Sequence, residues 1–434
     1  MGMLEIRDVL TTINFLLVIF MTIFFAYQTV FIAVGFIAKR VKKKEDDKNV
    51  PFGRYAAITS ARNEEAVIAQ LITSLKAQDY PSDLLDIYVI ADNCTDKTAE
   101  VARAHGAIVI ERHDEINKGK GYALDYFFKK MKKRVGSDHY DGYFVFDSDN
   151  IVDRDFVKEM NITYKTKDYD AMTSYRNSKN YAANWISAAN SLYFLKEARF
   201  LNYPRSLLKT NCAISGTGFF VSQRIIDQND GWPYHLLTED IEFSVDCAID
   251  GVKIGYCDKA MVYDEQPTTF KQSWTQRMRW SKGFYQINSR YTGRLIKGIF
   301  KDKSFSCYDL LASTAPLTLL QILVILVNIF VYIYCLGKYD TYFVLETKRI
   351  CLEFIMSYFI NIYLLNFSIG TLTLLSEWRN IKVNTFDKVK YLFSFPIFVM
   401  SYVPIGIVAL FKKVEWKEIK HFATDDILAF QGQK

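Results

Sequence analysis

The chain has 434 residues, of which 50% are hydrophobic and 15% aromatic, and its net charge is +6. This length accommodates one soluble domain of roughly 250 residues together with a membrane portion. The charge excess is small and much of it flanks apolar segments, so we exclude nucleic acid as a partner. The seven cysteines have no CxxC spacing, which indicates reduced thiols. The five histidines are scattered, so a bound metal should have oxygen ligands.

The first apolar segment, residues 13–38, carries no charge and is long enough to cross a bilayer. Five basic residues follow within residues 39–44, which places this flank in the cytosol and the N-terminus outside by the positive-inside rule. We therefore predict an N-terminal transmembrane helix with a basic flank over residues 1–44, in an integral membrane protein of the plasma membrane.

Residues 51–268 form the predicted cytosolic domain. Apolar and β-branched runs predict strands at 55–58, 87–90, 107–110, 143–146 and 171–174. Helical patterns lie between them at 64–78, 97–105 and 121–132, and Gly106 should end the second of these helices. Strands that alternate with helices predict an α/β domain with a doubly wound, parallel sheet.

Residues 269–303 predict an amphipathic helix, because Ile287, Tyr291, Leu295 and Ile299 recur every fourth residue with basic residues elsewhere around the helix. One interpretation is a helix that lies at the membrane surface. The alternative is a helix that packs its apolar stripe on the soluble domain.

The last region, residues 304–434, contains three more apolar segments at 310–336, 350–375 and 391–411, so we count four spans in all. Four crossings would put the C-terminus outside, yet the basic residues Lys412, Lys413, Lys417 and Lys420 favour the cytosolic side. Pro396 and Pro404 would allow a broken or re-entrant last span.

Polar residues inside these spans have two interpretations. They could line a polar pore or make contacts between packed helices. The residues concerned are Asn328, Asn361 and Asn366.

A pair of carboxylates, Asp147 and Asp149, follows the predicted strand at 143–146. Ligands bind at the carboxyl ends of strands in open α/β sheets, and two carboxylates there suit a hard divalent cation. The alternative is an ordinary turn after a strand, because Asp and Ser favour turns.

Three further loops should border the same crevice. The loop 59–65 contains Ser60, Arg62 and Glu64, and Asp92 ends the second strand. The Lys118 and Lys120 ammonium groups, at the start of a helix, suit a diphosphate. Helix caps and turns explain each of these loops equally well. The small residues Gly216, Thr217 and Gly218 would allow close approach of another molecule, or a plain turn.

Two helical motifs follow. Glu239 and Asp240 come after Thr238, and Asp240 would be a general base unless Thr238 is simply a cap with two acids in the first turn. Further on, Gln276, Arg279 and Trp280 have i, i+3, i+4 spacing and share one helix face. That face offers an amide, a guanidinium that can clamp phosphate, and an indole that can stack on a sugar.

Taken in order, Asp92, Asp147-Ser-Asp149, Thr238-Glu-Asp240 and Gln276-x-x-Arg279-Trp280 resemble the motifs of the processive family 2 glycosyltransferases. These are the cellulose, hyaluronan, chitin-oligosaccharide and poly-N-acetylglucosamine synthases. The resemblance implies a GT-A-type domain inserted between transmembrane helices, with amphipathic interface helices. It also implies an inverting enzyme that extends a β-linked polysaccharide from UDP-GlcNAc or UDP-Glc and translocates it, with Mg²⁺ or Mn²⁺ as cofactor.

The resemblance assigns roles to the motif residues. Asp240, with Glu239, would be catalytic, and Asp147 and Asp149 would hold the metal. The nucleotide sugar would contact Ser60, Arg62, Glu64, Asp92, Lys118, Lys120, Asp147 and Arg279. The acceptor would contact Gly216, Thr217, Gly218, Gln276 and Trp280.

The implied partners are the UDP-sugar, the growing polysaccharide, membrane lipid and an accessory subunit. Two other functions stay open: transfer of one sugar to a lipid carrier, and a non-catalytic membrane sensor or channel.

Overall fold

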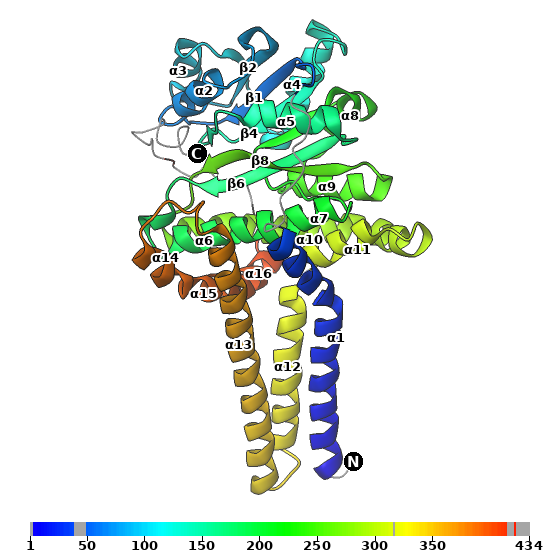
Figure 1. The fold of residues 1–434 in the computed structure, drawn as a ribbon. Coiled ribbons are helices and arrows are strands. Elements are labelled where there is room, and N and C mark those ends of the chain that lie inside the picture. Colours follow the sequence, from blue (N-terminus) through cyan, green and yellow to red (C-terminus); the bar gives the residue numbers. More distant parts are fainter. Residues whose placement is uncertain (1–2, 39–48, 316, 415–420, 422–434) are drawn as a thin grey trace.

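The computed structural model describes residues 3–38, 49–315, 317–414 and 421. Its centre is an eight-stranded sheet in the order β3-β2-β1-β4-β7-β6-β8-β5 (Figure 1). The strands are β1 (Tyr55–Ala61), β2 (Leu85–Asp92), β3 (Ile108–Arg112), β4 (Gly142–Phe146), β5 (Ile151–Val152), β6 (Ala171–Ser178), β7 (Phe219–Ser222) and β8 (Ile254–Asp264).

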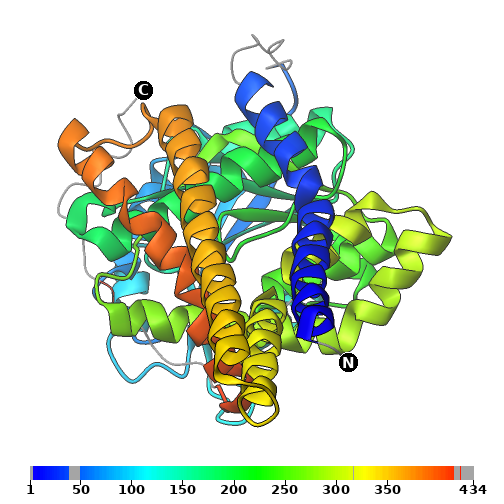
Figure 2. The ribbon, with the colours of Figure 1, turned by 90° about the horizontal axis from the view of Figure 1, so that it is seen from below.

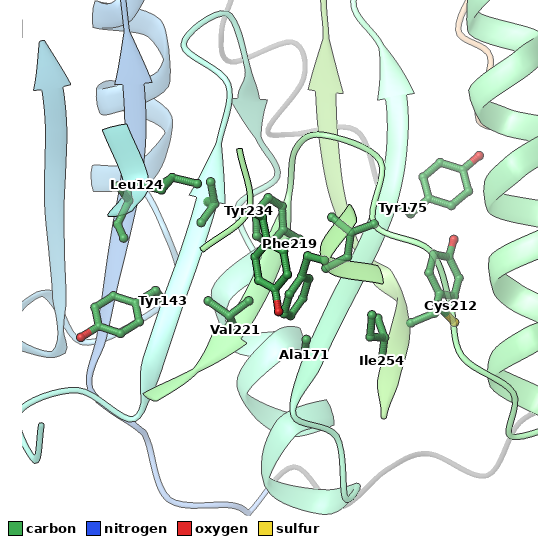
Figure 3. Packing of buried hydrophobic residues seen from close by; sticks show 14 of the residues in the cluster. Leu124, Tyr143, Ala171, Tyr175, Cys212, Phe219, Val221, Tyr234 and Ile254 are labelled. Carbon is green, nitrogen blue, oxygen red and sulfur yellow. The ribbon is translucent and has the colours of Figure 1, made fainter. Parts of the chain in front are cut away.

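Helices cover both faces of the sheet. One face packs against α2 (Ile68–Lys76), α3 (Thr98–Ala104) and α5 (Phe156–Thr166). The other packs against α4 (Lys120–Arg134), α6 (Trp185–Glu197), α8 (Gln223–Gln228) and α9 (Glu239–Asp250). Alternate residues of one strand supply the two cores, as in β4, where Tyr143 joins one and Phe144 the other. Figure 3 shows the core on the face covered by α4, α6, α8 and α9, around Tyr143, Phe219 and Val221.

The predicted strands and helices of residues 55–178 are present, but the sheet is mixed rather than wholly parallel. β3, β2, β1 and β4 are parallel, whereas β7 lies antiparallel between β4 and β6. β7 has only four residues and follows a turn in which Gly216 and Gly218 have positive φ. The strand order reverses between β1 and β4, so the loops after these two strands border the ligand crevice expected of such sheets.

Below the domain, α1 (Met3–Ala38), α12 (Leu317–Leu336) and α13 (Thr341–Glu377) run side by side away from it (Figures 1 and 2). α1 and α13 are long and apolar enough to cross a membrane, with mean hydropathies of 2.4 and 1.6. The basic residues 39–44, 417 and 420 lie outside the described residues.

The fourth predicted span is divided into three short helices: α14 (Thr385–Leu392), α15 (Ser394–Met400) and α16 (Tyr402–Phe411). The segment is apolar enough to cross, but it lies beneath the domain instead of running beside α1, α12 and α13 (Figure 1). Pro396 and Pro404 each fall in the first turn of a new helix, where a missing N–H costs little. The last predicted span is therefore not one continuous helix, and the count of four crossings stays a prediction.

The predicted amphipathic helix is α10 (Phe270–Lys301), and its apolar stripe is covered by protein. Ile287, Tyr291 and Leu295 are buried against α9 and α11 (Phe305–Thr314). Packing on the soluble domain is thus the correct interpretation, and contact of this stripe with lipid is wrong. The helix lies between the sheet domain and the long helices (Figure 1).

Buried ion pairs join the domain to these helices. The Arg205 guanidinium donates to both carboxylate oxygens of Asp309 at 2.7 and 2.9 Å, and Tyr27 Oη of α1 donates to the same carboxylate at 2.9 Å. On the other side, Glu377 at the end of α13 accepts from Arg199. Within the long helices, the Asn14 and Asn328 amides pair with each other, which is a packing contact between α1 and α12.

We predict that Asp309→Asn destabilises the whole protein. Removal of one partner leaves the Arg205 charge buried and uncompensated, which costs about 3–5 kcal/mol. Thermal unfolding in a fixed detergent should show a clearly lower midpoint. Asp230→Asn is the control, because Asp230 pairs with Lys132 at an exposed site and its loss should change little. Equal midpoints for both variants would show that the Arg205–Asp309 pair does not join the two parts.

Candidate active site

A cavity of about 220 Å³ lies at the carboxyl end of β4, between the sheet and α10. Six helices and strands, the loops beside them and one residue near the C-terminus contribute charged side chains to its lining. The charged lining residues are Glu64, Lys120, Asp147, Asp149, Arg176, Glu197, Glu239, Asp240, Asp264, Glu265, Arg279 and His421.

Asp147 is held in place by groups from two other segments. Its Oδ1 accepts from Lys120 Nζ at 2.5 Å, and Lys120 also donates to the Gly216 carbonyl at 2.6 Å. The Asp147 N–H donates to Thr217 Oγ1 at 2.9 Å. The start of α4, the end of β4 and the glycine turn before β7 are thereby fixed around one carboxylate.

Asp149 is buried on the floor of the cavity, and its Oδ2 accepts from the Glu265 N–H at 2.9 Å. Burial alone would raise the pKa of Asp149, but the nearby His421 and Lys179 cations lower it below the ordinary value. The carboxylate therefore stays ionised, as a metal ligand must.

The carboxylates fit a hard divalent cation that is shared with a substrate. The described residues contain no group of three or more His, Cys, Asp and Glu side chains arranged to hold a metal alone. Mg²⁺ is typically held by one or two carboxylates together with substrate phosphates, and Asp149 with Asp147 supplies that number.

The Asp147 and Asp240 carboxylates, one from each acidic motif, both lie beside Gly216. A Cβ built on Gly216 would lie 3.8 Å from Asp147 Oδ2 and 3.8 Å from Asp240 Oδ2. Gly216 also has φ +83°, a conformation that favours glycine. The turn therefore keeps open the space between the two carboxylates, where a substrate would react.

Asp240 lies in the first turn of α9, which Thr238 precedes. The Thr238 side chain makes no capping hydrogen bond, so the interpretation of this motif as a simple capped helix start is wrong. Burial raises the pKa of Asp240 and raises that of Glu239 to about 7, the latter with the help of the neighbouring Asp240 charge. Lys120 and Arg279 oppose both shifts.

Gln276, Arg279 and Trp280 line the same cavity, as their spacing on α10 predicted. The Trp280 ring packs edge-on against Phe194 at 5.8 Å. Arg277 points the opposite way and anchors α10, since its guanidinium donates to the Phe398 carbonyl at 2.9 Å. The motif thus presents three side chains to the cavity and one to α15.

Several predicted residues lie outside the cavity lining. Asp92 is buried in an ion pair with Arg112 at 2.6 Å, and Lys118 is exposed on the loop before α4. Ser60, Arg62, Thr217 and Gly218 are also absent from the lining. Asn63 does not cap α2, because its Oδ1 accepts from the Thr95 N–H at 2.8 Å.

Other cavity residues were not predicted. Arg176 of β6 pairs with Asp264, which ends β8, and its guanidinium stacks on Phe194 at 3.6 Å. Asp264 and Glu265 follow a strand just as Asp147 and Asp149 do, so the same pattern would have found them.

His421 Nδ1 lies 3.1 Å from Glu64 Oε2. Burial would lower the pKa of His421, but Asp149 and Glu64 raise it to about 9. No motif surrounds His421 in the sequence, so it carried no signal.

Comparison with known proteins identifies the family. Residues 53–283 match the family model described as glycosyltransferase-like family 2. The chain belongs to glycosyltransferase family 2. A mannosyltransferase of Pyrobaculum calidifontis, determined with GDP-Man and Mn²⁺, has the same GT-A-like fold: the TM-score is 0.56 at 13% identity, covering 93% of this chain and 99% of that chain. The domain is thus a GT-A-like glycosyltransferase.

The curated relatives in this family have different products. A β-monoglucosyldiacylglycerol synthase of Synechocystis is 25% identical over 56% of this chain and 50% of its own length. A poly-β-1,6-N-acetyl-D-glucosamine synthase of Staphylococcus epidermidis is 24% identical over 65% of this chain and 68% of its own length. The match to the glucolipid synthase thus spans only half of that enzyme.

We predict an acidic limb in the pH profile of this glycosyltransferase. A general base must be ionised, so turnover is present above the raised pKa of the Glu239–Asp240 pair and is lost as the pH falls through it. The limb should lie above the ordinary Asp pKa, because burial raises the pKa of Asp240. Glu239→Gln should move it to lower pH, because the repulsion between the two carboxylates is gone. Initial rates at saturating donor between pH 5 and 9 test this, and a wild-type limb near the ordinary Asp pKa of about 3.9 would contradict it.

Proposed function

We propose that this enzyme transfers a sugar from a UDP-sugar to an acceptor hydroxyl at a membrane, with inversion and with help from Mg²⁺ or Mn²⁺. The observation that carries the proposal is that Asp147 and Asp240 both lie beside Gly216, with Lys120 and Arg279 lining the same cavity. One wall then suits a diphosphate and the other an acceptor.

Asp240 acts as the general base. It takes the proton from the acceptor hydroxyl as that oxygen attacks the anomeric carbon, and the bond to the diphosphate breaks with its electron pair leaving on UDP. Attack from the side opposite the leaving group inverts the anomeric configuration. Burial raises the pKa of Asp240, which makes its carboxylate a stronger proton acceptor.

Cations on the other wall stabilise the leaving UDP. Lys120 exchanges its bond to Asp147 for a phosphate oxygen, and Arg279 offers a two-donor clamp. Asp149 and Asp147 would hold a divalent cation, which would neutralise charge on the diphosphate. Ser60, Arg62, Glu64, Asp92 and Lys118 lie on or near the loops that lead to the nucleoside end.

The acceptor side is formed by Gln276, Trp280 and the Gly216–Gly218 turn. A half-buried indole that lines the cavity beside Phe194 suits a sugar ring, and this favours a second candidate function: extension of a β-linked polysaccharide, as in the poly-N-acetylglucosamine synthase. Translocation of the polymer and an accessory subunit would belong to that function. A domain on the cytosolic side of the plasma membrane, with the N-terminus of α1 outside, fits either function.

We predict that the purified enzyme releases UDP from one of a panel of UDP-sugars, namely UDP-glucose, UDP-N-acetylglucosamine and UDP-galactose, when Mn²⁺ or Mg²⁺ is present. Asp240→Asn should lower turnover by about 10²–10⁴-fold with unchanged UDP affinity, because only the base is lost. UDP release and product size are measured together. A polymer would establish the second candidate function, and near-wild-type turnover by Asp240→Asn would overturn the assignment of the base.

We also predict that Asp149→Asn weakens Mn²⁺ binding in the presence of UDP. The loss should reach at least the roughly 10-fold caused by removing an outer-shell partner of a metal ligand. Electron paramagnetic resonance of free Mn²⁺ measures this without turnover. Asp168→Asn is the control, since that side chain is exposed outside the cavity. Equal Mn²⁺ affinity in the two variants would remove Asp149 from the metal site.

A further inference from the structure

A second cavity of about 240 Å³ lies below the active site. Its walls come from α6, α10, α11, α12, α13, α15 and α16, and α12 and α16 are among the most apolar helices of the chain. α12 and α13 extend from this level away from the domain (Figure 1). The second cavity is therefore placed where the domain meets the membrane-spanning part.

The two cavities adjoin each other. Tyr193 and Phe284 line both of them, so these two rings separate the charged space above from the space below. Tyr402, on the wall of the second cavity, stacks with Tyr193 at a centroid distance of 6.1 Å. A molecule that occupied both spaces would have to pass beside the Tyr193 and Phe284 rings.

The chemistry of the two linings is opposite. Twelve charged residues line the active-site cavity, whereas the described residues that line the second cavity include no charged side chain. Its lower walls are apolar or aromatic, with Ile325, Tyr358, Phe359, Ile362 and Val403 among them. Such a lining suits a hydrocarbon chain.

Three of its polar side chains already donate to backbone carbonyls, and one of them is Tyr285, whose Oη donates to the Gly406 carbonyl at 3.0 Å. Thr314 Oγ1 donates to the Leu310 carbonyl at 2.8 Å, and Asn366 Nδ2 donates to the Ile362 carbonyl at 2.9 Å. A polysaccharide that passed here would lose water from many hydroxyls without gaining equivalent partners. The second cavity therefore fits a lipid tail better than a sugar chain.

We propose that the second cavity holds the hydrocarbon tail of an amphiphilic acceptor. The tail enters from the membrane, between the long helices α12 and α13 on one side and the short helices α15 and α16 on the other. The headgroup then passes Tyr193 and Phe284, so that its hydroxyl reaches Asp240. This inference rests on the proposed glycosyl transfer and names the class of its acceptor: a hydroxyl-bearing membrane lipid.

The test uses a matched pair of substitutions on α13. Ile362→Trp places an indole in the second cavity, whereas Ile360→Trp adds the same group to a side chain that is 54% exposed on the outer surface. Both variants are placed in phosphatidylcholine nanodiscs. The acceptors are butyl, octyl and dodecyl glucoside and dioleoylglycerol. The rate of UDP release, after subtraction of the donor hydrolysis measured without acceptor, is followed against acceptor concentration and gives the acceptor KM.

For the wild type, each pair of methylenes that enters the second cavity should lower KM by about tenfold. Partition into the bilayer gives the same trend, so the comparison of variants decides. Ile362→Trp should raise KM for dodecyl glucoside and dioleoylglycerol by about tenfold or more relative to Ile360→Trp, with unchanged donor hydrolysis. Equal KM values for the two variants, or equal use of short and long tails by the wild type, would overturn the proposal.

A turnover-independent readout separates this inference from the proposed function. A dioleoylglycerol analogue with a diazirine near the tail end is photolysed in the same nanodiscs, and the labelled peptides are mapped by mass spectrometry. Labelling of Tyr358, Phe359 or Tyr402 that is lost in Ile362→Trp and kept in Ile360→Trp supports the tail site even if no donor releases UDP. Turnover with labelling elsewhere would retain the proposed function and overturn the tail site.

Discussion

The concentration of carboxylates in one partly dry cavity is the constraint on which the rest of the site depends. Asp147, Asp149, Asp240 and Asp264 come within one cavity, and burial raises the pKa of Asp264 to about 6 even with Arg176 beside it. Buried like charges are stable only when cations lie among them. Lys120, Arg176, Arg279 and His421 meet this need from four separate segments, so these charges hold the segments together around the cavity.

Helix α10 transmits this arrangement to the membrane side of the molecule. A Cβ on Gly283 would collide with the Thr238 side chain, so α10 lies directly against the turn that carries the base. Glu242, two residues after Asp240 on α9, accepts from Tyr291 Oη of α10 at 2.9 Å. On the other side of α10, the Arg277 guanidinium donates to the Phe398 carbonyl of α15. The acceptor face of the site is therefore built on the helix that also contacts the apolar segments.

The local sequence pattern predicted strands β1 to β4, because the strands of residues 55–146 alternate with helices and their carboxyl ends carry acids at one edge of the sheet. They could not place β7, since a four-residue strand is directed by the partners that it finds in the folded sheet. Periodicity showed which face of α10 is apolar but not that α9 and α11 cover it. Arg176 and His421 were not predicted as cavity residues, because their positions in the lining depend on chain segments that are far apart in sequence and meet only in the folded structure.

The path of the last apolar segment resolves a conflict between hydropathy and charge. Hydropathy alone favours a fourth crossing, whereas the basic residues after Phe411 favour the side on which the domain lies. We propose that α14, α15 and α16, which pack beneath the domain, meet both preferences: their apolar surface would lie at the membrane interface, and Lys412 would stay on the domain side. The same placement puts Val399, Met400 and Val403 on the wall of the second cavity, where a continuous crossing helix would have carried them away from the active site.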